Sequence, residues 1–575
     1  MVIHLTEDIS PSVWYGWGDP ARAKPLGPGA LEFLRSTLGL ASVAPVHPPV
    51  DLAEVRVGPA SLRETVLAEL RAITGAEHVA IDATERILHA GGKSTPDLLR
   101  RRAGDALDAP DAVIFPGSAE EVREILALCV ERKLAVVTFG GGTSVVGGVE
   151  PLRGRFDGII TLDMRRMNRL LHLDPLSRTA SFEAGIRGPA IEAALAPHGL
   201  TLGHFPQSHQ EATLGGYVAT RSSGQASTGY GRSDELVKSA HLETPMGPFD
   251  AGSLAPGTAA GPKLLDVVVG SEGTLGVITS ATLKVSPAPA EKVYGAWSFP
   301  SFAAGTEAMR QLRHHGVRGD MPHVCRLSDT DETASTFKLG GWKTGALSRY
   351  LSVRGQKTPA LALFVWEGPA PQIRARRRRS ARILRRAGGV PLGSLPGKSW
   401  EHGRFSGPYL RDELLTRGVY VETLETAATW SRLEETYRTV RQSILDALGE
   451  HGAAAFVQTH ISHVYPDGAS LYFTFLSGLE KDGLAQNARV KDAASRAIVA
   501  AGATITHHHA VGVDHAPYLN AEIGDLGITI LTSIKNALDP EGIMNPGKLI
   551  PSQPPVPATH PTTLPNTLPN TKERP

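Results

Sequence analysis

Short apolar runs alternate with helical apolar spacing along the chain from about residue 109. Residues 111–116 and 134–138 are apolar and rich in β-branched side chains, which predicts buried strands. Between them, 120–132 carries apolar residues at helical spacing, and Ser118 is placed to cap that helix. The alternation continues with strands expected at 159–162 and 179–183 and a helix at 189–198. We therefore predict an alternating α+β domain over 109–289.

A second region, 290–500, differs in composition, because its apolar runs contain aromatic residues. It is predicted to be an α/β cap domain built on an antiparallel sheet. The expected strands are 294–299, 361–366 and 471–476, and the expected helices are 302–314, 371–387 and 487–501. Residues 501–551 are then expected to return to the first domain through a helix over 524–536.

The two ends of the chain differ from both regions. Residues 1–108 contain likely anchoring aromatics at Trp14-Tyr15-Gly16-Trp17-Gly18 and are predicted to be a helical extension that wraps over another domain. The segment 552–575 is rich in Pro and Thr and lacks the apolar residues that a core needs. We predict that this tail is disordered.

Composition and charge narrow the class of protein. A chain of 575 residues is expected to form two or three domains. A formal net charge of +1 provides no global field for a nucleic acid, so no nucleic-acid partner is expected. Cys129 and Cys325 are the only cysteines, which excludes a disulfide framework and a cysteine-ligated metal. The sequence has neither a signal-like start nor an apolar run of about 18 residues, so we expect a cytoplasmic protein.

A glycine-rich loop follows the strand predicted at 134–138. It reads Gly140-Gly141-Gly142-Thr143-Ser144. Three glycines let the backbone turn sharply and gather its N–H groups around an anion, and the two hydroxyls add donors. The pattern is neither a G-x-G-x-x-G motif nor a Walker A loop. Two further glycine stretches, 213–224 and 270–279, lie in the same domain. Each alone is compatible with a simple turn, but together they favour the walls of an elongated nucleotide cavity.

Three adjacent histidines, His507-His508-His509, are the strongest candidates for chemistry. Neighbouring side chains point apart along an extended segment, so at best His507 and His509 are expected to share a side. A metal would then lack two ligands, and we expect no metal site. Because histidine titrates near neutral pH, proton transfer is the favoured interpretation.

Three further polar residues lie in apolar surroundings. Tyr472 is either a core aromatic whose hydroxyl has a partner or an acid–base group. Arg326 and Arg411 are each either a structural ion pair or a clamp for an anionic substrate.

The glycine stretches together resemble the FAD domain of the vanillyl-alcohol-oxidase type flavoproteins. The resemblance covers residues 109 to 550 and rests on the triple-glycine loop, T-L-G-G-Y-V-A-T-R-S-S-G, G-S-E-G-T-L-G-V-I-T and the ending L-D-P-E-G-I-M-N-P-G-K-L. It implies a two-subdomain FAD-binding domain with a separate cap. The glycine loop from Gly140 to Ser144 would hold the FAD diphosphate. The remaining wall would consist of Gly215, Gly216, Thr220, Ser222, Ser223, Glu272, Gly273, Thr274, Gly276 and Ile278. The loop contains no histidine, so FAD is expected to be bound noncovalently.

Four shorter motifs narrow the resemblance. H-H-H-A-V-G, the L-Y-F strand, C-R-L-S-D and Y-L-R-D resemble the alkyldihydroxyacetone-phosphate synthase family of ether-lipid enzymes. The resemblance implies that an acyl chain is exchanged for a fatty alcohol without net redox change. It assigns acid–base chemistry to Tyr472 and assistance in proton removal to His507, His508 and His509. It assigns substrate orientation to Arg326 and phosphate binding to Arg411.

Two other functions stay open. A FAD-linked 2-hydroxyacid dehydrogenase, for D-lactate or glycolate, shares the fold, and Tyr465-Pro466-Asp467-Gly468 after His460 and His463 resembles its substrate-side histidines. A lipid-interaction protein is the third class, because the arginine run 374–386 is either a membrane-facing helix or a solvated helix face. For the favoured enzyme we expect a small-molecule lipid substrate, a homodimer and peripheral membrane contact.

Overall fold

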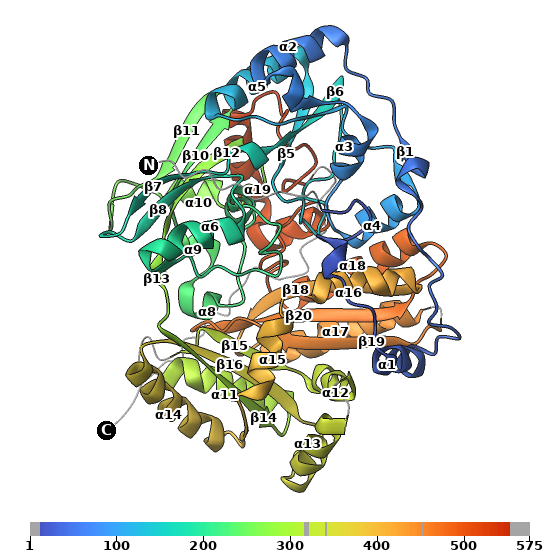
Figure 1. Ribbon diagram of the computed structural model, residues 1–575, viewed down its shortest axis with the longest axis vertical. Coiled ribbons are helices and arrows are strands. Elements are labelled where there is room, and N and C mark those ends of the chain that lie inside the picture. The colour runs from blue at the N-terminus through green and yellow to red at the C-terminus, as the bar shows by residue number, and fades with distance from the viewer. Residues whose placement is uncertain (1–11, 316–320, 340–341, 451, 552–575) are drawn as a thin grey trace, which may run out of the picture.

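The computed structural model describes residues 12–315, 321–339, 342–450 and 452–551 (Figure 1). The tail expected to be disordered, 552–575, lies outside the described residues. Two sheets form a first lobe, at the top of Figure 1, and a seven-stranded sheet forms a second lobe below it. No helix among the described residues has the length and apolar content needed to cross a bilayer.

The first sheet of the upper lobe has four strands in the order β2-β4-β6-β5. They are β2 (Val79–Ala80), β4 (Ala112–Ile114), β6 (Gly158–Asp163) and β5 (Leu134–Phe139). β4, β6 and β5 run parallel, which explains why β6 is buried along its whole length. Helix α5 (Ala119–Arg132) packs beside α2 (Glu64–Thr74), and Ser118 caps α5 by accepting a hydrogen bond from the Glu121 N–H at 3.2 Å.

The second sheet of the upper lobe has five antiparallel strands in the order β11-β10-β12-β8-β7. They are β11 (Gly247–Gly252), β10 (Val237–Thr244), β12 (Val277–Lys284), β8 (Thr179–Glu183) and β7 (Leu170–Asp174). Helices α6 (Gly188–Leu195) and α7 (Leu214–Ala219) contribute buried side chains to the same core. The pairs β9 (Leu200–Thr201) with β13 (Ser286–Pro287) and β1 (Arg56–Val57) with β3 (Asp105–Ala106) complete the strands of this lobe.

The second lobe contains the predicted antiparallel sheet, in the order β17-β14-β16-β15-β19-β20-β18. Its strands are β14 (Glu291–Phe299), β15 (Val324–Ser328), β16 (Ala360–Gly368), β17 (Val390–Gly393), β18 (Val419–Thr429), β19 (Ala455–Ile461) and β20 (Gly468–Gly478). Helices over and around the sheet are α11 (Phe302–His315), α12 (Thr330–Leu339), α13 (Trp342–Val353), α14 (Ala370–Arg386), α15 (Leu395–Gly403), α16 (Gly407–Thr416), α17 (Leu433–Gly449) and α18 (Gly483–Ala500). The division of the chain at residues 109, 290 and 501 stays a prediction.

Strand β20 shows how the sheet separates core from site. Leu471, Phe473 and Phe475 are fully buried in the core of the second lobe, while Tyr472 and Thr474 point to the opposite face. On that opposite face Tyr472 pairs with Glu425 of β18 and with His460 of β19. Three chemically active side chains therefore lie in one row across three strands.

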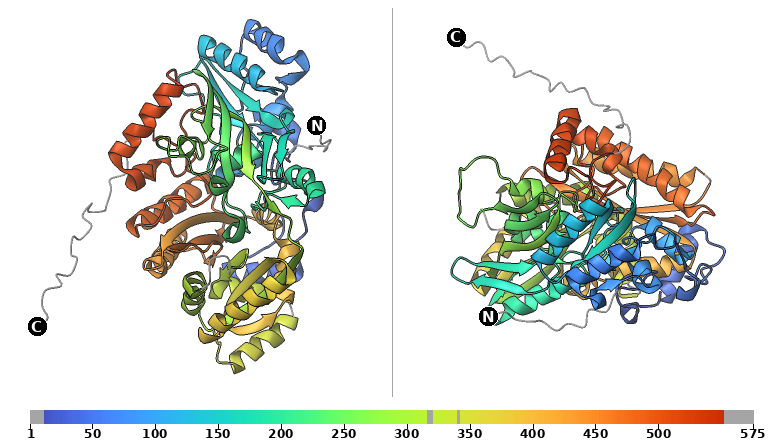
Figure 2. Two further views of the ribbon diagram at one scale, coloured as in Figure 1. Left: turned by 90° about the vertical axis from the view of Figure 1, so that its left-hand side faces the viewer. Right: turned by 90° about the horizontal axis from the view of Figure 1, so that it is seen from above.

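The chain ends tie the two lobes together. Helix α1 (Pro28–Leu38), far from the second lobe in sequence, packs against α12, β19 and β20 (Figure 1). The last helix, α19 (Leu519–Leu538), is interrupted at Gly524 and lies on the outside of the molecule (Figure 2). After it, Val136 of β5 donates its N–H to the Ile543 carbonyl at 2.9 Å and accepts from the Asn545 N–H at 2.8 Å. The C-terminal segment thus lies against the parallel sheet.

The triple-glycine loop owes two of its glycines to close packing. A Cβ at Gly140 would overlap the Thr213 hydroxyl, and one at Gly141 would overlap the Glu211 carbonyl. Gly142 alone has a left-handed backbone, with φ of 63°. The loop is therefore pressed against residues 211–213 and presents its other side to the interior of the lobe.

Candidate active site

One cavity of about 650 Å³ extends from the glycine loops of the upper lobe to the open face of the seven-stranded sheet. The residues expected to hold a nucleotide line it as a group: Gly140, Gly141, Gly142, Thr143, Ser144, Gly215, Gly216, Thr220, Ser222, Ser223, Glu272, Gly273, Gly276 and Ile278. Thr274 is the exception. It is buried behind the wall, where its hydroxyl donates to the Ser271 carbonyl at 2.7 Å and stabilises the turn.

This arm of the cavity fits FAD. Its wall consists of glycine backbone and small hydroxyl side chains, which allow the close approach that a diphosphate and a flat ring need. Thr138 also lines the arm, and its buried hydroxyl lacks a partner among the described residues. Glu272 has a structural task here, because its carboxylate accepts the N–H groups of Val511 and Gly512 at 2.8 and 2.7 Å. Burial raises the pKa of Glu272 to about 7.

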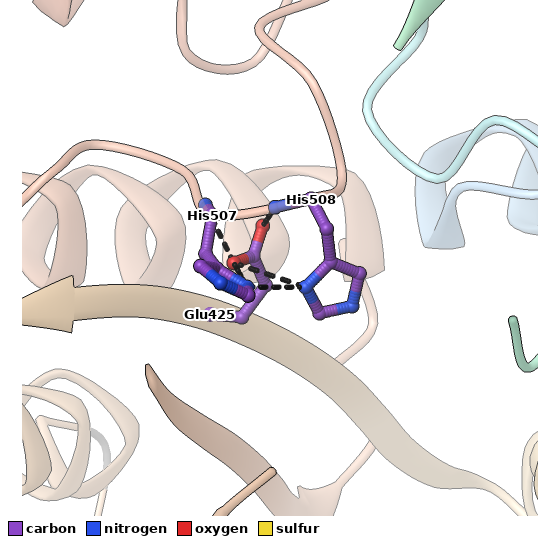
Figure 3. Close-up of side chains that lie close together, drawn as sticks. All are labelled: Glu425, His507 and His508. Carbon is purple, nitrogen blue, oxygen red and sulfur yellow. Dashed lines mark hydrogen bonds and ion pairs between the residues drawn. The ribbon is translucent and has the colours of Figure 1, made fainter. Parts of the chain in front are cut away.

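The three histidines lie on a loop that curls around the carboxylate of Glu425. Figure 3 shows this carboxylate with His507 and His508. The carboxylate accepts the backbone N–H of His507 at 2.6 Å, of His508 at 2.9 Å and of His509 at 2.8 Å. It also accepts the Thr506 hydroxyl at 2.7 Å. The four donors come from four consecutive residues, so Glu425 fixes the path of the loop.

The expectation that His507 and His509 share a side is wrong. The neighbours His507 and His508 converge instead, with their Nδ1 atoms 2.9 Å apart (Figure 3). The reason is the tight curl around Glu425, which replaces the extended path assumed from the sequence. The ligand atoms of Glu425, His507 and His508 lie within 4.8 Å of one another, a spacing that a metal could use. Both carboxylate oxygens, however, already accept hydrogen bonds from the loop, and we assign the cluster to loop anchoring.

The histidines differ in access to the cavity. The His508 and His509 side chains are 18% and 12% exposed and line it, whereas the His507 side chain is 2% exposed and does not. Both ring nitrogens of His507 are also engaged, Nδ1 by His508 and Nε2 by the Tyr465 hydroxyl at 2.6 Å. Of these three neighbours, His508 and His509 are therefore the two that reach the cavity, which His460 and His463 also line.

Tyr472 lines the cavity beside these histidines and so is not a core residue. Its ring stacks on His460 at 4.9 Å between centroids and an interplanar angle of 20°. It also stacks on His508 at 6.0 Å. Burial raises the pKa of Tyr472 to about 12, so the phenol holds its proton until a neighbouring group or substrate changes that balance.

The two arginines have different surroundings, although both line the cavity. Arg326 donates to Glu332 at 2.6 Å and contacts His460 Nδ1 at 3.0 Å, so its charge is already paired. Arg411, on α16, donates one N–H to the Lys93 carbonyl at 2.6 Å. Its Nε and Nη2 are buried and lack partners among the described residues. Arg411 is therefore the better candidate for an anion.

An apolar compartment occupies another part of the cavity wall. Helix α1 contributes Ala30, Phe33 and Leu34 to it, and the second lobe contributes Leu414, Val421, Phe456 and Leu476. The N-terminal helix thus completes a lining that the sheet alone would leave open to water. Such a lining suits a hydrocarbon chain.

The buried histidines make stability depend on pH. Burial lowers the pKa of His204, His463 and His508 to about 3 and of His509 to about 4, from an ordinary value of 6.5. In the unfolded chain these groups bind protons below about pH 6.5, while the folded protein does not until about pH 4. Stability is therefore fully present above pH 6.5 and falls as the pH is lowered towards 4.

We accordingly expect the melting temperature to drop steadily when the pH is lowered from 7.5 to 5. Replacing the buried His204 with Gln should make that drop shallower, while the same change at the exposed His198 should not. Thermal unfolding followed by circular dichroism measures both. A melting temperature that is constant over this range would contradict neutral burial of the histidines.

Comparison with known proteins agrees with this architecture. The family model "FAD binding domain" matches residues 110–249, and "FAD linked oxidases, C-terminal domain" matches residues 288–549. The alkyldihydroxyacetonephosphate synthase of Trypanosoma brucei brucei is 32% identical over 96% of this chain and 94% of its own length. The enzyme of that name from Dictyostelium discoideum is 33% identical over 94% of this chain and 93% of its own.

A solved structure of an alkyldihydroxyacetonephosphate synthase superposes with a TM-score of 0.79 and 30% identity, covering 93% of this chain and 99% of the other. The fold and the glycine-lined cavity thus define a FAD-dependent enzyme of the FAD-linked oxidase class, with the predicted FAD-binding domain and cap. Within that class, the chain belongs to the alkyldihydroxyacetonephosphate synthase family.

Several residues of the site escaped the sequence analysis. Glu425 was not singled out, although a carboxylate inside the apolar strand 419–429 was a usable signal. Tyr465 and His463 were noted only for the dehydrogenase. Lys93 lies next to Arg411, and its N–H donates to the Ser144 carbonyl at 2.6 Å, a contact that no local pattern reveals.

Proposed function

We propose that this protein exchanges the acyl chain of acyl-dihydroxyacetone phosphate for a fatty alcohol, giving an alkyl ether and a free fatty acid. One observation carries the proposal: a single cavity unites a FAD-fitting arm, an arginine without a carboxylate partner, an acid–base face and an apolar compartment. An oxidase of small hydroxyacids needs no such apolar compartment. A phosphorylated lipid substrate needs a cation for its phosphate and an apolar wall for its hydrocarbon chain.

Each group has a task in this proposal. Arg411 binds the substrate phosphate through its two unpartnered N–H-bearing nitrogens, because charge-assisted hydrogen bonds favour oxyanions. Arg326, held by Glu332 and His460, orients the substrate beside Tyr472. The apolar compartment takes the acyl chain and then the alcohol chain. FAD held by the glycine loop from Gly140 to Ser144 would supply the flavin ring that activates the substrate carbon for the exchange.

Protons are handled by the row of Tyr472 with His508 and His509. The departing fatty acid takes the ester oxygen with it, and the alcohol oxygen forms the new bond to the substrate carbon. The alcohol must lose its proton in that step, and a neutral imidazole that faces the cavity can accept it. Tyr472 lies within stacking contact of His508 and acts on the substrate from the sheet side.

Product analysis tests the proposal. Purified protein given palmitoyl-dihydroxyacetone phosphate and hexadecanol is expected to release palmitate and hexadecyl-dihydroxyacetone phosphate in equal amounts. It is expected to pass no electrons from D-lactate or glycolate to an acceptor dye. Steady dye reduction by either hydroxyacid, without ether formation, would instead make the protein a 2-hydroxyacid dehydrogenase.

Two expectations about partners belong to the same proposal. Peripheral membrane contact is supported by α14, whose residues Arg374, Arg377, Arg378, Arg382, Arg385 and Arg386 are all exposed. Binding to anionic liposomes should then be lost when these arginines become Gln. A homodimer is supported by the exposed apolar residues Ile523, Leu526 and Ile530 of α19. A monomeric sedimentation coefficient at micromolar concentration would contradict it.

A further inference from the structure

Glu425 occupies a place in the site that the reaction roles above do not use. It is fully buried on β18, directly opposite Tyr472 in the sheet. Its two oxygens accept four hydrogen bonds from residues 506–509, with donor distances from 2.6 to 2.9 Å. A buried carboxylate with this many donors is held as the anion.

The same carboxylate lies beside all three imidazoles. The Nδ1 atoms of His507, His508 and His509 are 3.8, 3.5 and 3.9 Å from its oxygens. Burial alone would raise the pKa of Glu425, but the three imidazoles and the backbone N–H groups hold it well below its ordinary value. Glu425 is therefore a carboxylate anion at neutral pH.

In the part of the chain that the structure describes, Glu425 is the one carboxylate among the main electrostatic partners of these histidines. The remaining charged or titratable groups that face them from the surrounding elements are Arg232, Lys491, His460, His463, His515, Tyr465 and Tyr472. The two permanent cations in this set oppose protonation of the imidazoles, as burial does. Among the described residues, Glu425 is the carboxylate that favours a proton on them.

We propose that Glu425 is a positioning residue with two tasks: it shapes the three-histidine loop and it is the counter-charge for the imidazolium that forms when the alcohol loses its proton. The proton leaves the alcohol oxygen and joins a ring nitrogen of His508 or His509, and the positive charge then sits beside a fixed anion. This inference rests on the proposed function for the origin of the proton. The effect of the Glu425 charge on the pKa of the imidazoles does not depend on the reaction.

The Glu425→Gln variant tests whether Glu425 acts through its negative charge or only by holding the loop in shape. The amide keeps the shape and one acceptor oxygen but removes the negative charge. The imidazoles should then become harder to protonate, so the acid limb of the pH profile of kcat should move to lower pH. The plateau kcat should fall by about tenfold or more, because a weaker base accepts the alcohol proton. Simple loosening of the loop would let water reach the histidines and move the acid limb upward, towards their ordinary pKa.

Glu192→Gln is the matched control. Glu192 also accepts backbone N–H groups, those of Leu202 at 3.1 Å and Gly203 at 3.2 Å, but it does not line the cavity. Its replacement is expected to leave the pH profile of exchange unchanged. An acid limb that stays in place or moves upward in Glu425→Gln would overturn the proposal, as would an unchanged plateau kcat.

A second readout does not depend on the reaction. Nuclear magnetic resonance of the holoenzyme labelled with ¹⁵N-histidine follows the imidazole titrations, which should move to lower pH in Glu425→Gln and stay in place in Glu192→Gln. If the wild type performs no exchange but the titrations move as expected, the proposed function fails and the role of Glu425 as counter-charge stands. If exchange occurs and the titrations do not move, the role of Glu425 fails alone. A zinc ion that co-purifies with the wild type and is lost in Glu425→Gln would also overturn the role of Glu425 as counter-charge.

Discussion

The Tyr472→Phe variant is expected to lose about 10²- to 10⁴-fold in kcat for exchange, with FAD binding and stability retained. Only the hydroxyl is removed. The ring can keep its stacking on His460 at 4.9 Å and its place between β18 and β19. Because Tyr472 shares the cavity face with His508 and His509, loss of the phenolic proton removes one partner of the acid–base row. Steady-state exchange kinetics, with the flavin content measured by absorbance, checks the prediction.

The Tyr437→Phe variant is the matched control. The Tyr437 hydroxyl donates to Asp329 at 3.1 Å, on a part of the second lobe that does not line the cavity. Its loss should cost about 1 kcal/mol of folding free energy and leave exchange unchanged. If Tyr472→Phe kept the wild-type kcat, the phenol would have no acid–base role and the histidines alone would carry the protons.

The second large effect is expected at Arg411. Replacing it with Met should raise KM for the phosphorylated substrate by about 10²- to 10⁴-fold, because two hydrogen bonds to a charged group are worth about 1.5–3 kcal/mol each, or about 3–6 kcal/mol together. The folded protein should lose little stability. Among the described residues the guanidinium donates one hydrogen bond, to the Lys93 carbonyl, and it interacts with the Asp412 carboxylate without a hydrogen bond, so a partly buried cation is costly to keep there. Kinetics and chemical denaturation measure the two quantities.

Arg326→Met is expected to lose stability as well as substrate orientation. Arg326 is the guanidinium that faces the buried Glu332, so its removal leaves that carboxylate with His460 at 3.4 Å in place of a permanent cation and should cost about 3–5 kcal/mol of stability. The comparison separates a cation whose main effect is on substrate binding, Arg411, from one that also carries folding free energy, Arg326. A large loss of stability in Arg411→Met, without a change in KM, would contradict its assignment to the phosphate.

Periodicity predicted several elements close to their observed bounds. The strand over 134–138 is Leu134–Phe139, and the helix over 120–132 is Ala119–Arg132 with Ser118 as its cap. Apolar spacing is a local property, and the buried faces of these elements obey it. The strand expected over 471–476 is part of Gly468–Gly478. Side chains alternate between the two faces of a strand, but the sequence alone does not tell which face is packed in the core. The structure resolves that question by burying Phe473 and turning Tyr472 to the cavity.

The parts of the site that sequence could not reveal depend on long-range contacts. Glu425 binds a loop 82 residues away in the sequence. Arg411 donates a hydrogen bond to the carbonyl of Lys93, which is 318 residues away. The side on which the histidines meet follows from the curl around Glu425 and not from their spacing. The requirement for glycine in the triple-glycine loop also comes from a tertiary contact, because a side chain at Gly141 would overlap the Glu211 carbonyl.

The source of the ether oxygen is the most direct test of the exchange reaction. Hexadecanol labelled with ¹⁸O and unlabelled palmitoyl-dihydroxyacetone phosphate are incubated with the enzyme, and the products are analysed by mass spectrometry. The label is expected entirely in hexadecyl-dihydroxyacetone phosphate, and the released palmitate is expected to be unlabelled. Label in hexadecyl palmitate would show acyl transfer to the alcohol, and an ether phosphate without label would show that the alcohol oxygen does not form the new bond. Either result would contradict the exchange.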